Sequence, residues 1–152
     1  MAIPTEPVGS IPRSPELLGS VAAYEKGEID DTALAAVQYQ AVRDTISRLE
    51  EIGSPVVTDG EQSKPSFATY PVAGIAGLAP DGVIIPFADG HRRQLPVLTE
   101  GPFRYQAHAE TYLRAALAHA TVPVKQAVIA PSALSLLYPA GVGRLQPGGL
   151  PR

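Results

Sequence analysis

The stretch Val56-Val57-Thr58-Asp59-Gly60-Glu61-Gln62-Ser63-Lys64-Pro65-Ser66-Phe67 is the most informative part of this sequence for the fold. Two valines and a threonine, all β-branched, run directly into a carboxylate, a glycine and a second carboxylate, which is typical of a buried strand that ends in a polar site. Ligands of parallel sheets bind outside the carboxyl ends of the strands, so we predict that Asp59 and Glu61 lie at such a rim. An ordinary turn after a strand is the alternative, because Asp-Gly is a common turn dipeptide.

Composition and charge exclude several classes of protein. The 152 residues are 45% hydrophobic, with a mean hydropathy of +0.05, as expected for one soluble globular domain. The apolar stretch at 127–137 is much shorter than the roughly 20 residues that span a bilayer, and residues 1–13 contain no hydrophobic signal region. A net charge of -3 without a block of Lys or Arg gives no surface for nucleic acid. We therefore predict a cytoplasmic protein with neither nucleic-acid nor membrane partners.

The sequence offers few groups that could bind a metal. It contains no cysteine, which removes thiolate ligands and cysteine nucleophiles. His108 and His119 lie about 16 Å apart along the helix that we predict for them, so they cannot share a metal ion. His91 is interpreted as an exposed turn residue. We predict no metal ligands in this chain.

Two helices precede the central stretch. Ser14-Pro15-Glu16 is a helix start, with Ser at the cap and Pro in the first turn, and Gly27 ends that helix. A second helix is predicted from Asp30 or Asp31 to about Ile52, with an apolar face made of Leu34, Val37, Ala41, Thr45 or Ile46, Leu49 and Ile52. It leads into the strand at Val56, so the order is β-α-β, for which a parallel strand pair is the default.

The rest of the chain adds a hairpin, a helix and a strand. Lys64 to Tyr70 is compatible with one or two helical turns. Residues 83–87 and 93–98 flank an Asp-Gly turn and are predicted to form an inserted β-hairpin with edge strands. A helix over 105–120 and a buried strand over 123–130 follow, with Ser132 just after the strand. The predicted fold class is α/β, a partial (truncated) TIM-type β/α barrel with an inserted β-hairpin.

Three segments of the chain resemble those of a known family. Val8-Gly9-Ser10-Ile11-Pro12-Arg13, Val56 to Glu61 and Lys64 to Tyr70 resemble the catalytic domain of cobalamin-independent methionine synthase and its shorter homologues. The similarity extends from about Pro7 to Pro139. It implies a zinc-dependent β/α barrel, without cobalamin, that transfers a methyl group from a methylated folate or another donor to the sulfur of homocysteine in methionine biosynthesis.

The resemblance also implies site residues. Gly9, Ser10 and Glu61 correspond to the positions that hold the amino-acid substrate, with Asp59 as a neighbour, and Ser132 to the segment that lines the donor side. An α-amino acid offers an ammonium for a carboxylate and a carboxylate for backbone or hydroxyl donors, which these residues can supply. Ser132 belongs to the sequence Ala-Pro-Ser-Ala, where the best-known members of the family have Thr-Gly-Pro. The resemblance therefore does not identify the methyl donor. The family binds zinc through His, Cys, Glu and Cys from later strands, so we assign no catalytic and no metal residues.

The last twelve residues look different from the rest. Residues 141–152 show no periodicity, and a shifted reading frame or a damaged gene is our hypothesis for them. A complete barrel takes roughly 250 residues, so residues 1–140 are predicted to form the N-terminal half of one.

Three function classes follow from this reading. The first is a methyltransferase fragment that is inactive alone. The second is a non-catalytic amino-acid-binding module that retains the homocysteine or methionine pocket. The third is an unrelated hydrolase that uses Asp59 and Glu61 as acid and base.

Overall fold

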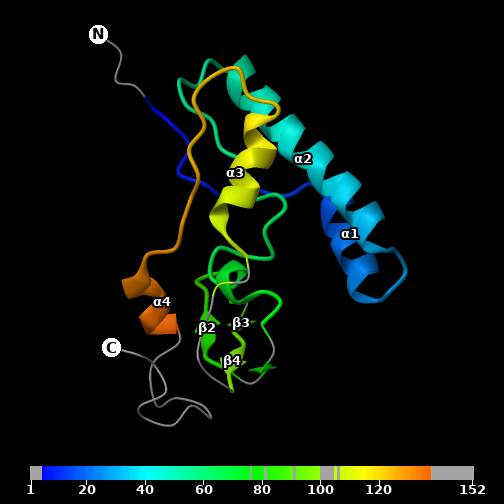
Figure 1. Cartoon of the computed structure of the whole chain (residues 1–152), viewed down its shortest axis with the longest axis vertical. Helices are drawn as coiled ribbons and strands as arrows, with labels where there is room; N and C mark the ends of the chain where they lie inside the picture. The colour runs from blue at the N-terminus through cyan, green and yellow to red at the C-terminus, as the bar shows by residue number, and fades with distance from the viewer. Residues whose placement is uncertain are drawn as a thin grey trace. The chain divides into compact units, whose positions relative to one another are not determined.

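The computed structural model describes residues 5–75, 77–80, 82–90, 92–99, 105 and 107–137, which combine helices with short strands (Figure 1). They form two compact units. The first comprises the described parts of Met1–Lys64 and Ala109–Val128, and the second those of Pro65–His108 and Ile129–Arg152. In these ranges no helix has both the length and the apolar character needed to cross a membrane. The predicted tail over 141–152 lies outside the described residues.

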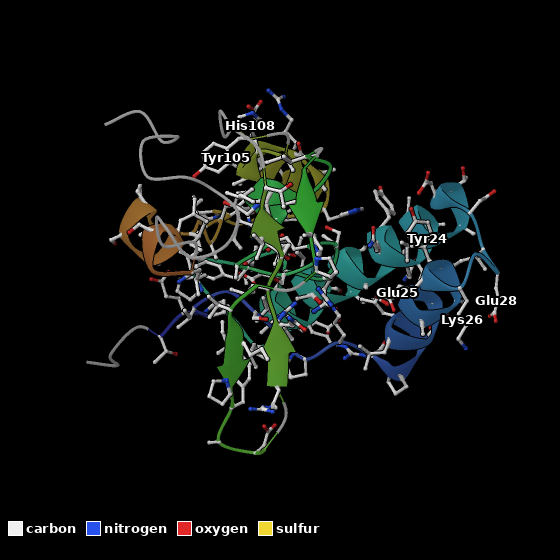
Figure 2. All side chains as sticks on the ribbon, turned by 90° about the horizontal axis from the view of Figure 1, so that it is seen from below. Tyr24, Glu25, Lys26, Glu28, Tyr105 and His108 are labelled. Carbon is white, nitrogen blue, oxygen red and sulfur yellow. The ribbon has the colours of Figure 1, made fainter. Side chains whose placement is uncertain are left out.

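The two predicted N-terminal helices are confirmed. Helix α1 spans Pro15–Glu25, and the Ser14 hydroxyl accepts a hydrogen bond from the Leu17 N–H at 3.2 Å. Helix α2 spans Asp31–Glu51 and is capped in the same way by Asp30. The two helices pack together (Figure 1). Tyr24, labelled near the end of α1 in Figure 2, donates from its hydroxyl to the Asp31 carboxylate at the start of α2, at 2.6 Å.

The core of the first unit lies between α2, helix α3 (Ala109–Leu117) and the Val57 segment. Its buried members are Val42, Ile46, Val57 and Ala116. The predicted apolar face of α2 is therefore partly wrong. Val42 was not assigned to that face, and Ile52, which was, is 79% exposed because it lies past the helix end.

The central stretch pairs in parallel, as predicted, but only briefly. Val57 and Val124 form a parallel bridge, in which the Val57 N–H donates to the Pro123 carbonyl and the Lys125 N–H to the Val57 carbonyl, both at 2.9 Å. The prediction of a buried strand through Ala130 is wrong, since the backbone after Val124 joins no ladder in the described residues and Val128 is 58% exposed. A strand of a parallel sheet is buried only when other elements cover both of its faces, and the Val57 segment alone cannot do this for residues 124–130. No closed barrel is present within the described ranges.

The second unit contains the predicted hairpin. Strands β2 (Ile84–Pro86) and β3 (Arg92–Gln94) pair antiparallel, and β1 (Leu78–Ala79) pairs with β4 (Val97–Leu98) in the same sense. The Gly90 N–H donates to the Phe87 carbonyl, which closes the turn. His91 lies outside the described residues. Residues 64–69, for which helical turns were predicted, contain a turn closed by the Tyr70 N–H and the Ser66 carbonyl at 3.0 Å, and a short 3-10 helix η1 (Tyr70–Val72) follows it. Helix α4 (Pro131–Leu137) follows the 124–130 segment.

Candidate functional site

The turn Asp59–Lys64 holds two consecutive residues in the left-handed backbone region. Gly60 has a φ of 63° and Glu61 a φ of 56°, which an L-residue adopts only at an energetic cost. The Asp59 carboxylate accepts the Glu61 N–H at 3.1 Å, and the Lys64 N–H donates to the Glu61 carbonyl at 3.3 Å. These bonds fix the backbone from which the Glu61 side chain projects.

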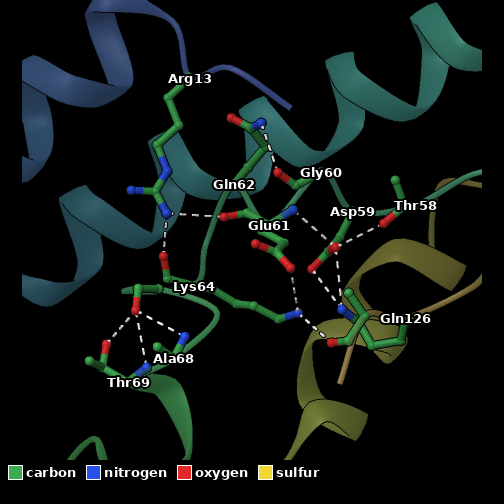
Figure 3. A network of polar contacts seen from close by, with 12 residues as sticks. Arg13, Thr58, Asp59, Gly60, Glu61, Gln62, Lys64, Ala68, Thr69 and Gln126 are labelled. Carbon is green, nitrogen blue, oxygen red and sulfur yellow. Dashed lines mark hydrogen bonds and ion pairs between the residues drawn. The ribbon is translucent and has the colours of Figure 1, made fainter. Parts of the chain in front are cut away.

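Asp59 is a structural partner of this turn. Its side chain is fully buried, and its carboxylate also accepts hydrogen bonds from the Thr58 hydroxyl at 3.3 Å and from the Gln126 amide nitrogen at 3.3 and 3.4 Å (Figure 3). Together with the Glu61 N–H, three residues of the protein therefore donate hydrogen bonds to the Asp59 carboxylate. This arrangement argues against Asp59 as one half of an acid–base pair.

The segment 9–13 lies along the turn and is tied to it by hydrogen bonds. The Ile11 N–H donates to the Gly60 carbonyl at 3.0 Å, and the Gln62 amide nitrogen donates to the Ile11 carbonyl at 2.9 Å. The Arg13 guanidinium donates to the carbonyls of Glu61 and Lys64 (Figure 3). Sequence reasoning assigned no role to Arg13 or Gln62, because their partners lie about fifty residues away in the chain.

Gly9 and the Glu61 carboxylate come together in this arrangement. Gly9 is buried, and a Cβ at this position would lie 3.0 Å from the Ala127 Cβ and 3.4 Å from Glu61 Oε1. Side chains of the protein itself therefore approach the Gly9 backbone closely, which the missing Cβ allows. Ser10, the next residue, is exposed.

The structure thus brings together four of the five predicted site residues: Gly9, Ser10, Asp59 and Glu61. Ser132 belongs to the second unit, where it is exposed as the second residue of α4 and its carbonyl accepts the Ser135 hydroxyl at 2.8 Å. Its assignment to a donor side stays a prediction.

Lys64 is a member of the site that the sequence did not reveal. Only 1% of the residue is exposed, and its ammonium donates to the Ala127 carbonyl at 2.8 Å and lies 3.7 Å from Glu61 Oε1. The ammonium is also 5.4 Å from the centre of the Tyr112 ring. A lysine among Ser and Pro in a polar stretch looks like a solvated residue, so no local signal marks its burial.

The described residues do not fit the zinc site that the resemblance implies. Among them no group of three or more His, Asp or Glu side chains could hold a metal ion, and the sequence has no cysteine. His119 packs edge-on against Tyr39 in the first unit, with ring centres 4.5 Å apart, whereas His108 lies beside Tyr105 in the second (Figure 2).

Comparisons with known proteins confirm the resemblance found in the sequence. The chain is 32% identical over 68 residues to a 5-methyltetrahydropteroyltriglutamate–homocysteine methyltransferase of Shewanella oneidensis, a match that covers 45% of this chain and 9% of the relative. Among solved structures it resembles a B12-independent methionine synthase from Shewanella sp. W3-18-1 in complex with selenomethionine. That likeness has a TM-score of 0.59 at 19% identity and covers 72% of this chain and 33% of the other.

These relatives are much longer than the region they share with this chain. The match covers less than a tenth of the curated relative and a third of the solved chain. A scan against protein-family models found no match.

Proposed function

We propose, from the confirmed relationship to cobalamin-independent methionine synthases, that this chain holds the amino-acid substrate of a methyltransferase, homocysteine or its product methionine. The proposal places the α-ammonium of the ligand at the Glu61 carboxylate, and its carboxylate at the backbone and hydroxyl of Gly9 and Ser10. A cytoplasmic role in methionine biosynthesis belongs to the same proposal.

The observation that carries the proposal is the placement of a buried carboxylate against a glycine. Glu61 is 8% exposed, and Gly9 leaves room in front of its Oε1 atom that a Cβ would take up. A carboxylate in a largely dry setting binds an ammonium more strongly than one in water does, because water no longer competes for the charge. The solved relative, whose complex contains selenomethionine, supports a ligand of this chemical class.

In the proposed reaction the bond between the methyl carbon and its donor atom breaks and a bond from that carbon to the homocysteine sulfur forms. The thiol proton passes to the donor atom, so that the products are the thioether of methionine and the demethylated donor. The residues of this chain would orient the amino acid by its two charged groups, which fixes the direction of its side chain. The methyl donor is proposed to be a methylated folate or another methylated compound.

A non-catalytic amino-acid-binding module is the second candidate. It is favoured by the lack of cysteine in this sequence and of a metal-binding cluster among the residues that the structure describes. Such a module would bind homocysteine and methionine but would not transfer a methyl group. Calorimetry with both ligands, followed by an assay for methionine formation with methyl donor and zinc added, separates the two candidates.

Removing the charge of Glu61 tests the binding site in both cases. In the 152-residue chain, Glu61→Gln should weaken binding of L-methionine by roughly 1.5 to 3 kcal/mol, the scale of a hydrogen bond to a charged group. Glu6→Gln is the matched control, because Glu6 is an exposed glutamate whose carboxylate pairs with Lys125 at the surface, at 3.3 Å. Isothermal calorimetry should show no change for this control.

The ion pair between Glu61 and buried Lys64 predicts that Glu61→Gln also lowers the melting temperature. Affinities are therefore compared at a temperature where both variants are folded by circular dichroism. An unchanged affinity for L-methionine in folded Glu61→Gln would count against the site.

A further inference from the structure

The buried Lys64 ammonium is held by a backbone carbonyl and lies beside the Glu61 carboxylate. A buried charge is costly unless it is paired and hydrogen-bonded. The 2.8 Å bond to the Ala127 carbonyl anchors the ammonium, while the 3.7 Å separation from Glu61 Oε1 is an ion-pair distance and longer than a normal hydrogen bond. The Ala127 carbonyl thus anchors the ammonium, and the charge of the lysine acts on the Glu61 carboxylate.

Lys64, Ala127 and Gly9 lie around the Glu61 carboxylate and also contact one another through Ala127. The Lys64 ammonium faces the Glu61 carboxylate (Figure 3) and donates to the Ala127 carbonyl. A Cβ at Gly9 would lie against the Ala127 side chain and the same Glu61 oxygen. The carboxylate is therefore held between a fixed cation and a glycine backbone. A carboxylate has about four lone-pair directions, so a ligand ammonium can bind it in addition to Lys64.

We infer that Lys64 is a positioning residue which holds the Glu61 carboxylate for the amine of the ligand, and so makes the site selective for α-amino acids over the same molecules without the amine. This inference rests on the proposed amino-acid site. Its physical basis is that the free energy of a charged hydrogen bond depends strongly on geometry, and an unpaired buried carboxylate would turn away from the site. Lys64 need not touch the ligand.

The test compares two lysines and two ligands in the full 152-residue chain. Lys64→Met replaces the buried ammonium by an apolar group of similar length. Lys125→Met is the control, because Lys125 lies on the same extended segment as Ala127 and pairs with Glu6 at the surface. The ligands are L-methionine and 4-(methylthio)butanoate, which lacks only the amine, and affinities are measured by calorimetry.

We expect Lys64→Met to lose about tenfold or more in affinity for L-methionine, equivalent to about 1.4 kcal/mol, and less than about twofold for the analogue. Lys125→Met should leave both affinities unchanged. Equal losses for the two ligands would show a general collapse of the pocket and overturn the inference, and so would unchanged affinities in Lys64→Met.

A measurement without ligand separates this inference from the proposed function. If the unmodified chain binds neither ligand, the proposed amino-acid site fails and the selectivity inferred from it fails too. Thermal unfolding then tests by itself whether Lys64 holds the Glu61 carboxylate. When Lys64 holds the buried Glu61 carboxylate, the double variant Lys64→Met/Glu61→Gln should melt at a higher temperature than Lys64→Met alone, because it no longer buries an unpaired charge. A double variant that melts no higher would overturn the inference.

Discussion

Two Asp-Gly turns of this chain share a dipeptide and differ in almost everything else. Asp59-Gly60 is buried, and the Asp59 carboxylate accepts donors from Thr58, Glu61 and Gln126. Asp89-Gly90, in the hairpin, is exposed, and a Cβ on Gly90 would meet nothing within 4 Å. Both glycines have positive φ, 63° and 89°. The dipeptide therefore determines the turn, whereas the segments packed around it determine whether the turn can build a site.

Replacing each aspartate in turn by alanine should reveal the largest difference between the two turns, in the free energy of unfolding that is lost. Asp59→Ala leaves the Glu61 N–H and the Gln126 amide without their acceptor in a buried setting, and should destabilise the chain by roughly 3 to 5 kcal/mol. Asp89→Ala, at an exposed turn, should cost less than about 1 kcal/mol. Urea unfolding followed by circular dichroism measures both. Similar losses for the two variants would mean that burial does not separate the turns.

Adding one methyl group to each glycine sharpens the comparison. Both alanines must adopt a positive φ, which costs about 1 to 2 kcal/mol. In Gly60→Ala the new Cβ would also lie 2.8 Å from Thr45 Cγ2 and 3.1 Å from Ile11 Cβ, so the total should reach about 2 to 4 kcal/mol. Gly90→Ala should show the backbone cost alone. Unfolding midpoints in urea that shift by the same amount would contradict the close packing at Gly60.

Elements whose causes are local could be predicted from the sequence. Ser14 and Asp30 cap their helices through side chains that reach only three residues along the chain, and the hairpin turn depends on its own Asp-Gly. The predicted length of the strand after Val124 was wrong, because the burial of a strand depends on neighbouring segments that a local sequence pattern does not contain. Val128 is apolar and yet exposed for this reason.

The candidate site divides in the same way. Asp59 and Glu61 stood out because they follow a run of β-branched residues at the point where a strand is expected to end, and Gly9 and Ser10 came from the resemblance to a family. The burial of Lys64 could not be predicted, since the Ala127 carbonyl that binds its ammonium lies 63 residues away. Gln126 was missed for the same reason, as it reaches Asp59 across 67 residues.

The smallest expected effect concerns Glu50, a carboxylate that makes at the surface the kind of bond that Asp59 makes in the interior. Glu50 accepts the Thr121 N–H at 2.6 Å and the Thr121 hydroxyl at 3.0 Å, and these bonds, the backbone one above all, lower the pKa of Glu50 from its usual 4.5. A carboxyl whose pKa is lower in the folded state stabilises the fold above its unfolded pKa, and this contribution is lost as the pH falls through the folded value. The melting temperature of the unmodified chain should therefore exceed that of Glu50→Gln at neutral pH, and the gap should close on acidification from about pH 6 to about pH 3. Thermal unfolding by circular dichroism across this range measures the gap, and a gap that stays constant with pH would show that the charge of Glu50 contributes nothing to the bond with Thr121.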